Sequence, residues 1–286
     1  MNVINYDEWE LFSARRNSTN YRSFDQSKVL KVSGPDLTYD LDVLEHEKAI
    51  TEAVVSLGIK TPRVLEIVKD PKGTYGIIYE NVKDKLSISR ALSQDLEGID
   101  KYVKMFADAV KKLHTTKCTS PIFTKYRDFA KDFISKSERY TEKQRSYLLR
   151  LIDQTEDIEM CMHGDCHPGN FIFSKDKVFA IDLAFFAKGH PLFDIGAFYC
   201  FAVKMPDDVI KGVFHVEPKV MKEFWDKFIP LYLDTNDEKV INDFNRKIES
   251  YGFIGLAKHA SHLPDPYVYF DMLNRDFDEA FKWMDE

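Results

Sequence analysis

The sequence lacks a long uncharged apolar run, and no stretch approaches the roughly 18 residues that a membrane span needs. It also lacks a basic surplus, since 47 acidic against 40 basic residues give a net charge of −7. That balance disfavours binding to nucleic acid or to an anionic membrane. Four cysteines in 286 residues are too few for a disulfide framework. The first ten residues show no basic-then-apolar signal pattern, so we expect a cytoplasmic protein.

What the sequence does contain is an ordinary globular composition, with 44% apolar and 30% charged residues and no internal repeat. The local pattern changes character near residue 82. Before that point strands are predicted at Val29–Val32, Val64–Val68 and Thr74–Tyr79. A single helix, from about Leu41 to Leu57, separates the first strand from the second.

Helical patterns dominate after residue 87. Three short apolar runs, at 158–162, 171–173 and 178–181, indicate a small central sheet. We therefore expect an α+β fold with a β-rich N-terminal lobe over residues 1–82 and a larger, mainly helical C-terminal lobe over residues 83–286. The predicted helices run from Ser87 or Ser89 to Leu113 as one long helix, and then near 124–137, 141–154, 193–204, 217–233, 237–259 and 267–284.

The stretch most informative about function is Met162–Phe171, which reads Met-His-Gly-Asp-Cys-His-Pro-Gly-Asn-Phe. Asn170 follows Asp165 by five residues, and Asp182 ends the apolar run beginning at Val178. Protein kinases have the same Asp-to-Asn spacing and a later metal-binding Asp. Phosphoryl transfer depends on positioning and charge neutralisation, and Mg²⁺ prefers oxygen ligands. We predict that Asn170 and Asp182 bind Mg²⁺, and that Asp165 activates or orients an acceptor hydroxyl.

Two simpler interpretations apply to the same stretch. Asp165 and Asn170 could be ordinary turn residues, although the later Asp182 makes this less plausible. A zinc site is the other alternative. Its ligands would be Cys161, His163, Cys166 and His167. The spacing of these four residues is poor for zinc, and the sequence contains no second cysteine–histidine cluster.

The order His-Gly-Asp-x-His-x-x-Asn followed by Ile-Asp resembles the aminoglycoside phosphotransferase and choline kinase family, small-molecule kinases with a bilobal, protein-kinase-like fold. A further match is Gly189-His-Pro-Leu-Phe-Asp-Ile-Gly196. The resemblance implies that Asp194 opens a helix and braces the catalytic loop. We interpret His163 as structural support for the same loop, without a catalytic role.

The resemblance extends to the first lobe. It implies that Lys31, in Val-Leu-Lys-Val, contacts the α- and β-phosphates and pairs with Glu47 on the following helix. Glu45 and Glu52 are rival partners on that helix. Without the resemblance, Lys31 could be an exposed strand lysine and Glu47 a solvated helix charge.

Glu80 and Val82, in Ile-Tyr-Glu-Asn-Val, resemble the hinge whose backbone binds the purine. One departure from kinases is that the first glycine, Gly34, lies beyond Lys31, so no glycine-rich loop can cover the phosphates. The polar stretch 13–20 occupies that place, and we predict that Ser18 and Thr19 in it bind phosphate.

A second departure is Asp-Leu-Ala at 182–184, where protein kinases have Asp-Phe-Gly, and no Ala-Pro-Glu triplet follows. Both features argue against a protein substrate. We therefore expect a Mg²⁺-dependent kinase that moves the γ-phosphoryl group of ATP or GTP to a hydroxyl of a small molecule. A catalytically inactive nucleotide-binding module is the alternative, supported only by the atypical phosphate loop.

The acceptor is open. The last 25 residues hold seven acidic and two basic residues, which would suit a cationic acceptor such as an aminoglycoside or choline. The same charges also suit the solvated face of an amphipathic helix whose apolar stripe includes Leu273 and Phe277. Sugars, amino alcohols and hydroxy amino acids remain alternatives. The sequence chooses neither between ATP and GTP nor among oligomeric states.

Overall fold

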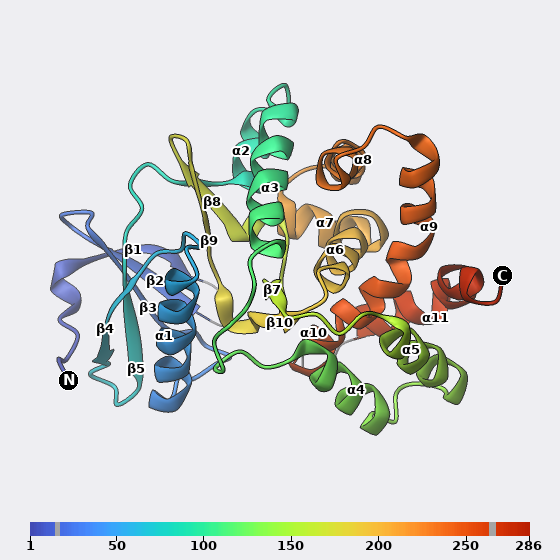
Figure 1. The fold of residues 1–286 in the computed structure, drawn as a ribbon. Helices are drawn as coiled ribbons and strands as arrows, with labels where there is room; N and C mark the ends of the chain where they lie inside the picture. The colour runs from blue at the N-terminus through green and yellow to red at the C-terminus, as the bar shows by residue number, and fades with distance from the viewer. Residues whose placement is uncertain (15–17, 263–266) are drawn as a thin grey trace. The chain divides into compact units, whose positions relative to one another are not determined.

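The computed structural model describes residues 1–14, 18–262 and 267–286, and the chain divides into two compact units (Figure 1). The first unit contains residues 1–86 together with 172–184, and the second contains residues 87–171 and 185–286. The stretch 172–184, which carries Asp182, therefore groups with the β-rich unit, although it follows the start of the helical one in sequence.

The first unit is built on a five-stranded antiparallel sheet with the strand order β1-β2-β3-β5-β4. The three predicted strands correspond to β3, β4 and β5. The other two were not predicted, because β2 reads Ser-Thr-Asn-Tyr-Arg-Ser and β1 is largely exposed, so neither carries an apolar alternation. The bounds are β1 (Trp9–Ala14), β2 (Ser18–Ser23), β3 (Lys28–Ser33), β4 (Val64–Lys69) and β5 (Tyr75–Glu80).

Helix α1 (Leu41–Ser56) follows β3 and packs against β4 and β5 (Figure 1). Its buried face includes Leu44, Thr51 and Val54, which are seven and three residues apart, as one face of a helix requires. Gly58 has a φ of +76°, a left-handed conformation that favours glycine, and it lies just beyond the end of the helix. The predicted helix at 41–57 is thus confirmed.

The second unit is mainly helical (Figure 1). Phe106 on α3 packs edge-on or tilted against four other buried phenylalanines, with ring centroids 5.0–5.8 Å apart. These four rings are Phe171, Phe198, Phe224 and Phe228. The helices are α2 (Ile88–Gln94), α3 (Ile99–His114), α4 (Tyr126–Lys136), α5 (Glu142–Gln154), α6 (Leu192–Tyr199), α7 (Asp207–Phe214), α8 (Pro218–Leu233), α9 (Glu238–Gly255), α10 (Ala257–His262) and α11 (Tyr267–Phe281).

Three helical predictions need correction. The single helix expected up to Leu113 is two helices, because Asp95 accepts hydrogen bonds from Gly98 N and Tyr102 Oη and so ends α2 and starts α3. The helix expected over 237–259 is α9 followed by α10. The helix expected over 193–204 is α6 followed by a π-helical turn, η4 (Cys200–Lys204). In addition, helix α7 was not predicted.

Helices α6 and α9 cross at close range. A Cβ added at Gly196 would lie 2.3 Å from Gly252 N, and one added at Gly252 would lie 2.4 Å from Gly196 O. Both positions therefore require glycine, since any side chain would force the two backbones apart. This crossing holds α6, which carries Asp194 in its first turn.

The predicted short strands are present. Strand β7 (Met160–Met162) pairs antiparallel with β10 (Ala187–Gly189). Strands β6 (Leu86–Ser87), β8 (Phe171–Ser174) and β9 (Lys177–Ala180) form a three-stranded sheet in the order β6-β8-β9. Short 3₁₀ turns complete the described chain: η1 (Tyr6–Glu8), η2 (Pro168–Asn170), η3 (Leu183–Phe185) and η5 (Lys282–Met284).

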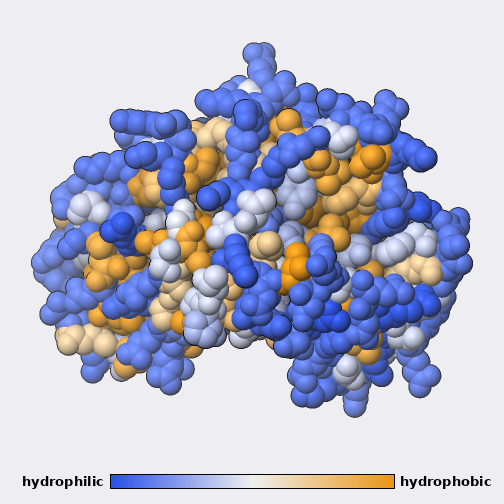
Figure 2. Space-filling model, in the orientation of Figure 1, coloured by the Kyte–Doolittle hydropathy of each residue, from blue (hydrophilic) through white to orange (hydrophobic). Residues whose placement is uncertain are grey.

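Helix α11 has the expected amphipathic pattern, because Leu273 and Phe277 are buried and Asp271 and Asp278 are exposed. Polar side chains cover most of the face that Figure 2 shows, with apolar patches between them. Within the described residues, no helix combines the length and the apolar character needed to span a bilayer.

Candidate active site

The His-Gly-Asp stretch forms a tight loop between β7 and η2. Gly164 has a φ of +77°, and a Cβ added to it would lie 2.1 Å from the carbonyl oxygen of Phe185. Only glycine fits here, both for its backbone conformation and for the close approach of that carbonyl group. The loop therefore turns sharply and presents the next residue, Asp165.

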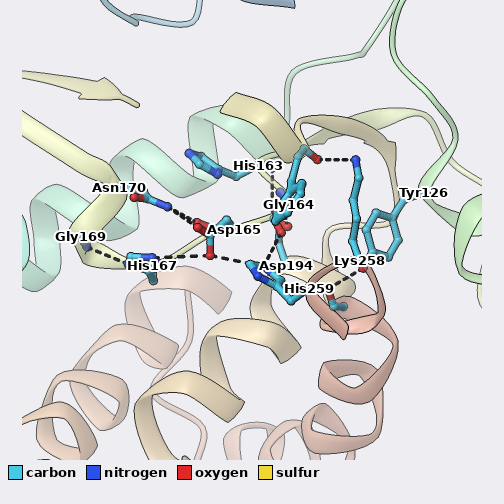
Figure 3. Close-up of polar contacts among 12 residues, drawn as sticks. Tyr126, His163, Gly164, Asp165, His167, Gly169, Asn170, Asp194, Lys258 and His259 are labelled. Atoms are coloured by element: carbon cyan, nitrogen blue, oxygen red, sulfur yellow. Dashed lines mark hydrogen bonds and ion pairs between the residues drawn. The ribbon is translucent and has the colours of Figure 1, made fainter. Parts of the chain in front are cut away.

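Asp194 holds this loop from the first turn of α6. One carboxylate oxygen accepts a hydrogen bond from His163 N at 2.6 Å, and the other accepts one from Gly164 N at 2.9 Å (Figure 3). His114 Nε2 on α3 lies 3.1 Å from the first of these oxygens. The Asp194 side chain is only 2% exposed, so these N–H groups replace the water that a buried carboxylate would otherwise need. This is the bracing geometry expected from the family resemblance.

No motif in the sequence pointed to His114. Its other ring nitrogen, Nδ1, lies 2.9 Å from the Tyr232 hydroxyl on α8, so the imidazole links three helices. Within the described residues, the only cluster of three or more histidine, cysteine, aspartate or glutamate side chains close enough to share one metal ion is His114, Cys166 and Asp194. It does not contain the zinc set considered from the sequence, and its Asp194 oxygens already accept the hydrogen bonds described above. The zinc alternative thus gains no support.

Asp165 is enclosed by N–H donors on three sides (Figure 3). Asn170 Nδ2 donates to Asp165 Oδ2 at 2.7 Å and to the Asp165 carbonyl oxygen at 3.0 Å. His167 Nε2 and His259 Nε2 lie 3.5 and 3.4 Å from Asp165 Oδ1. Burial alone would raise the pKa of Asp165, but His167, His259 and His163 outweigh it and hold that pKa well below its ordinary value. The group is therefore a carboxylate at neutral pH.

Two details follow from these contacts. His167 Nδ1 accepts a hydrogen bond from Gly169 N at 3.1 Å, so in the neutral ring the proton is on Nε2, facing Asp165. Asn170 directs its amide nitrogen to Asp165, which leaves its amide oxygen as the atom able to bind a cation. The side chain of Asp165 itself is 20% exposed, so one side remains open to a second molecule.

The first unit contains a separate pocket, in whose wall lies an ion pair. Lys31 Nζ on β3 lies 3.1 Å from Glu47 Oε1 on α1, and these side chains are 19% and 13% exposed. The Tyr79 hydroxyl on β5 donates to the same glutamate oxygen. The rival partners Glu45 and Glu52 are exposed, and Glu52 pairs with Lys48 instead. The structure thus identifies Glu47 as the partner of Lys31.

This pocket has a volume of about 260 Å³ and also includes Asp182. Asp182 follows β9 in a left-handed conformation, with a φ of +61°, which aspartate tolerates better than most residues. Burial by itself would lower the pKa of Lys31, but Glu47 and Asp182 outweigh it and raise that pKa above its ordinary value. The walls include Phe12, Ser13, Ser18, Asn20, Val29, Lys31, Glu47, Thr51, Tyr79, Glu80, Lys85 and Asp182.

The remaining predicted nucleotide contacts lie at the edges of this unit. Ser18 is in the pocket wall together with Asn20, while Thr19 lies between them on β2, where successive side chains point to opposite faces. Residues 15–17 of the predicted phosphate-binding stretch lie outside the described residues. Glu80 lines the pocket, and Val82 lines a neighbouring depression.

Lys85 is a pocket residue that the sequence did not single out. It donates to Asn81 Oδ1 at 2.8 Å, and burial, with a smaller effect of Arg22, lowers its pKa to about 8. Of the other predicted residues, Asp165, Asn170, His163 and Asp194 are together in the second unit. Asp182 belongs to the first unit, with Lys31 and Glu47.

This combination of a five-stranded lobe with a strand lysine paired to a helix glutamate, and a braced His-Gly-Asp loop in a helical unit, is characteristic of protein-kinase-like phosphotransferases. A model of the phosphotransferase enzyme family matches residues 8–213, well over half of the chain. The protein therefore belongs to this family. A search of curated proteins finds no match.

Solved structures agree on the fold. An aminoglycoside phosphotransferase, APH(3'')-Id from Streptomyces rimosus in complex with ADP and streptomycin, has a TM-score of 0.53 at 19% identity, over 88% of this chain and 93% of that chain. The ethanolamine kinase of Plasmodium vivax has a TM-score of 0.62 at 16% identity, over 98% and 85%. The amicoumacin kinase hAmiN, in complex with AMP-PNP and Ca²⁺, has a TM-score of 0.53 at 14% identity, over 98% and 90%. At these identities the likeness establishes the protein-kinase-like fold.

Proposed function

We propose that the protein transfers the γ-phosphoryl group of ATP or GTP, in a Mg²⁺-dependent reaction, to a hydroxyl group of a small molecule. The observation that carries this proposal is the partly exposed Asp165 carboxylate, fixed by Asn170 in the loop that Asp194 braces. The family supports small-molecule phosphotransfer in general. The nucleotide and the metal are our inference from the residues of this chain.

The pocket of the first unit supports the proposal that the protein binds a nucleoside triphosphate. Lys31 is a partly buried cation whose pair with Glu47 fixes the direction of its ammonium group. A fixed cation in a partly desolvated pocket attracts phosphate oxygens more strongly than a solvated lysine would. We infer that Lys31 binds the α- and β-phosphates, that Ser18 approaches the phosphates from β2, and that the backbone near Glu80 and Val82 binds the purine. Thr19, whose side chain lies on the opposite face of β2, is left out of this assignment.

The predicted magnesium ligands fit this ion chemically. Asp182 offers a carboxylate, and Asn170 offers the amide oxygen left over once its nitrogen bonds to Asp165. Hard oxygen ligands of this kind suit Mg²⁺, which also keeps some water and takes phosphate oxygens. A bound Mg²⁺ would neutralise charge on the β- and γ-phosphates. The bonding of the Asn170 amide is thus the structural reason to assign it this role.

The contacts of Asp165 define what it can do in this reaction. Its carboxylate can accept a hydrogen bond from the acceptor hydroxyl and aim the hydroxyl oxygen at the γ-phosphorus. The new O–P bond forms as the bond from the γ-phosphorus to the β–γ bridging oxygen breaks, and the hydroxyl proton passes to Asp165. Because the N–H donors lower its pKa, Asp165 is a weak base, so orientation is its larger contribution.

The acidic C-terminus gives little support to a cationic acceptor. Several of its carboxylates are engaged by basic residues elsewhere in the second unit. Asp278 pairs with Lys143, and Asp285 pairs with Arg150. These charges stabilise α11 and its surroundings, so the acceptor class must come from experiment.

A nucleotide-consumption screen against hydroxylated metabolites, with ATP, GTP and Mg²⁺, tests the proposal. Wild-type protein should consume nucleotide faster with at least one acceptor, and Asp165→Asn should lose roughly 10²-fold or more in turnover while keeping nucleotide affinity within a few-fold. Transfer by Asp165→Asn at the wild-type rate would refute the role of Asp165. A wild-type protein that binds nucleotide but never turns it over would instead be the inactive binding module.

A further inference from the structure

His259 contacts the catalytic loop although it lies far from that loop in the sequence. It lies on α10, 95 residues from Gly164, and no motif drew attention to it. Its Nε2 atom lies 3.4 Å from Asp165 Oδ1 and 3.2 Å from the carbonyl oxygen of Gly164 (Figure 3). A single ring nitrogen thus faces two oxygen atoms of consecutive residues in the loop.

These two neighbours determine which ring nitrogen carries the proton. A carbonyl oxygen can only accept a hydrogen bond, and a carboxylate oxygen likewise accepts. The Nε2 atom of His259 must therefore be the donor, and the neutral ring must be the Nε2–H tautomer. Together with His167, it places two imidazole Nε2 atoms 3.4–3.5 Å from Asp165 Oδ1, while Asn170 donates to Oδ2.

The His259 ring has little freedom to move away. Phe185 and Phe201 pack against it edge to face, with ring centroids 4.9 and 5.6 Å away and interplanar angles of 84° and 82°. The preceding residue, Lys258, donates to the carbonyl oxygen of Phe185 at 3.3 Å. Helix α10 is thus joined to the catalytic loop and to the segment packed on Gly164 by two consecutive side chains.

We propose that His259 is a positioning residue that sets the orientation of the Asp165 carboxylate, an inference that rests on the proposed kinase function. A carboxylate rotates easily about its last side-chain bond unless both oxygens are held. Asn170 holds one oxygen and the two imidazole groups hold the other. Without His259 the carboxylate keeps its charge but aims the acceptor hydroxyl less well, and a small misplacement of reacting groups lowers turnover.

Two substitutions of His259 separate hydrogen bonding from packing. His259→Phe fills the space between Phe185 and Phe201 but removes the donor, whereas in His259→Gln the amide nitrogen can reach the position of Nε2. We expect His259→Phe to lose about tenfold in kcat, with the KM for nucleotide unchanged, and His259→Gln to stay within about threefold of wild type. His46→Phe, at an exposed histidine on α1, is the matched control and should behave as wild type. Unchanged kcat in a folded His259→Phe protein would overturn the proposal.

A double-mutant cycle with Asp165→Asn tests whether His259 acts through Asp165. If it does, adding His259→Phe to Asp165→Asn should cost less than about twofold, because the oriented group is already impaired. An additional tenfold loss would mean that His259 acts through general structure, and would overturn the proposal. Slow hydrolysis of ATP with Mg²⁺ provides the assay until an acceptor is known.

Nuclear magnetic resonance of the protein with ¹⁵N-labelled histidine gives a readout that does not depend on turnover. At neutral pH the ring of His259, assigned by its absence in His259→Gln, should show the Nε2–H tautomer, and Asp165→Ala should shift its Nε2 signal. An Nδ1–H tautomer, or no shift in Asp165→Ala, would contradict the contact. If the wild type never transfers phosphate, the proposed function fails, while these spectra still decide whether His259 orients Asp165.

Discussion

The two compact units compensate their buried charges in different ways. In the first, Lys31 and Glu47 neutralise each other as an ion pair, with Asp182 in the same pocket. In the second, Asp165 and Asp194 are held by N–H groups of the backbone, an amide and imidazole rings. In the ion pair, the Lys31 ammonium group keeps its charge and can also bind a phosphate oxygen. Several N–H donors around one carboxylate instead fix the direction of that carboxylate. In the proposed reaction, this difference would correspond to a division between binding the nucleotide and orienting the acceptor.

Among the substitutions that test this difference between the two units, Asp182→Ala should have the largest effect. We expect it to abolish Mg²⁺-dependent nucleotide binding and to lower turnover by about 10³-fold or more, because a carboxylate ligand of the ion is lost. Asp165→Asn, in contrast, should keep nucleotide affinity. Titration with a fluorescent nucleotide with and without Mg²⁺ distinguishes the two. Asp176→Ala, at an exposed residue of the same β8–β9 hairpin, is the control. Unaltered nucleotide affinity in folded Asp182→Ala would remove it from the metal site.

The ion pair of the first unit gives the next largest effect. Lys31→Met should lower kcat/KM for the nucleotide by about 10²-fold, since it removes a fixed cation from the phosphates. Glu47→Gln should cost less, about tenfold, because Lys31 keeps its charge but loses its anchor. Steady-state kinetics at varied nucleotide concentration measures both. Glu52→Gln, on the exposed face of the same helix, should stay within about twofold. Equal losses in Glu47→Gln and Glu52→Gln would disprove the pairing.

In the second unit, Asp194→Asn should mainly affect stability. The asparagine amide has only one acceptor oxygen and no charge, so one of the hydrogen bonds from His163 N and Gly164 N is lost and the other is weakened. We therefore expect the free energy of unfolding to fall by about 2–4 kcal/mol. Urea unfolding followed by circular dichroism measures this. Asp278→Asn removes an exposed ion pair with Lys143 and should cost no more than about 1 kcal/mol. Similar values for both variants would argue against the bracing role.

Outside the His-Gly-Asp loop, the second unit also contains a buried carboxylate that is held by an ion pair. Glu249 on α9 is 8% exposed and pairs with Lys204 at 2.8 Å. Burial and the neighbouring Asp276 raise the pKa of Glu249 to about 7, with Lys204 opposing the shift. The folded protein therefore binds this proton more tightly than the unfolded chain does. The stability from this group is complete below its ordinary pKa of about 4.5 and is lost as the pH rises through 7.

Glu249→Gln should sharpen that result by removing the titration while keeping the shape. Between pH 5 and pH 8 the free energy of unfolding of the wild type should fall by about 1–3 kcal/mol more than that of Glu249→Gln. Urea unfolding at several pH values gives the difference, in which the titrating groups that do not interact with Glu249 cancel. Parallel pH profiles for the two proteins would show that Glu249 does not titrate in this range.

The catalytic loop could be predicted from sequence because its chemistry is local. Asp165 and Asn170 lie five residues apart in one turn, so the spacing itself limits their geometry, and Gly164 has the residue type that the turn requires. The strands β3, β4 and β5 were equally accessible, since apolar patterns and turn residues define them. Strands β1 and β2 could not be predicted in this way, because the residues of β2 are mostly polar and the apolar residues of β1 do not alternate with polar ones.

The residue types of the site, the order of the lobes and the family resemblance can thus be read from the sequence alone. Which groups surround each carboxylate depends on the tertiary structure. Helix α3 brings His114 to Asp194, and α10 brings His259 to Asp165, across separations at which no spacing rule applies. The choice of Glu47 over Glu45 and Glu52 was settled by which face of α1 packs on the sheet. Local patterns specify what a segment can form, whereas the packing of distant segments specifies what it contacts.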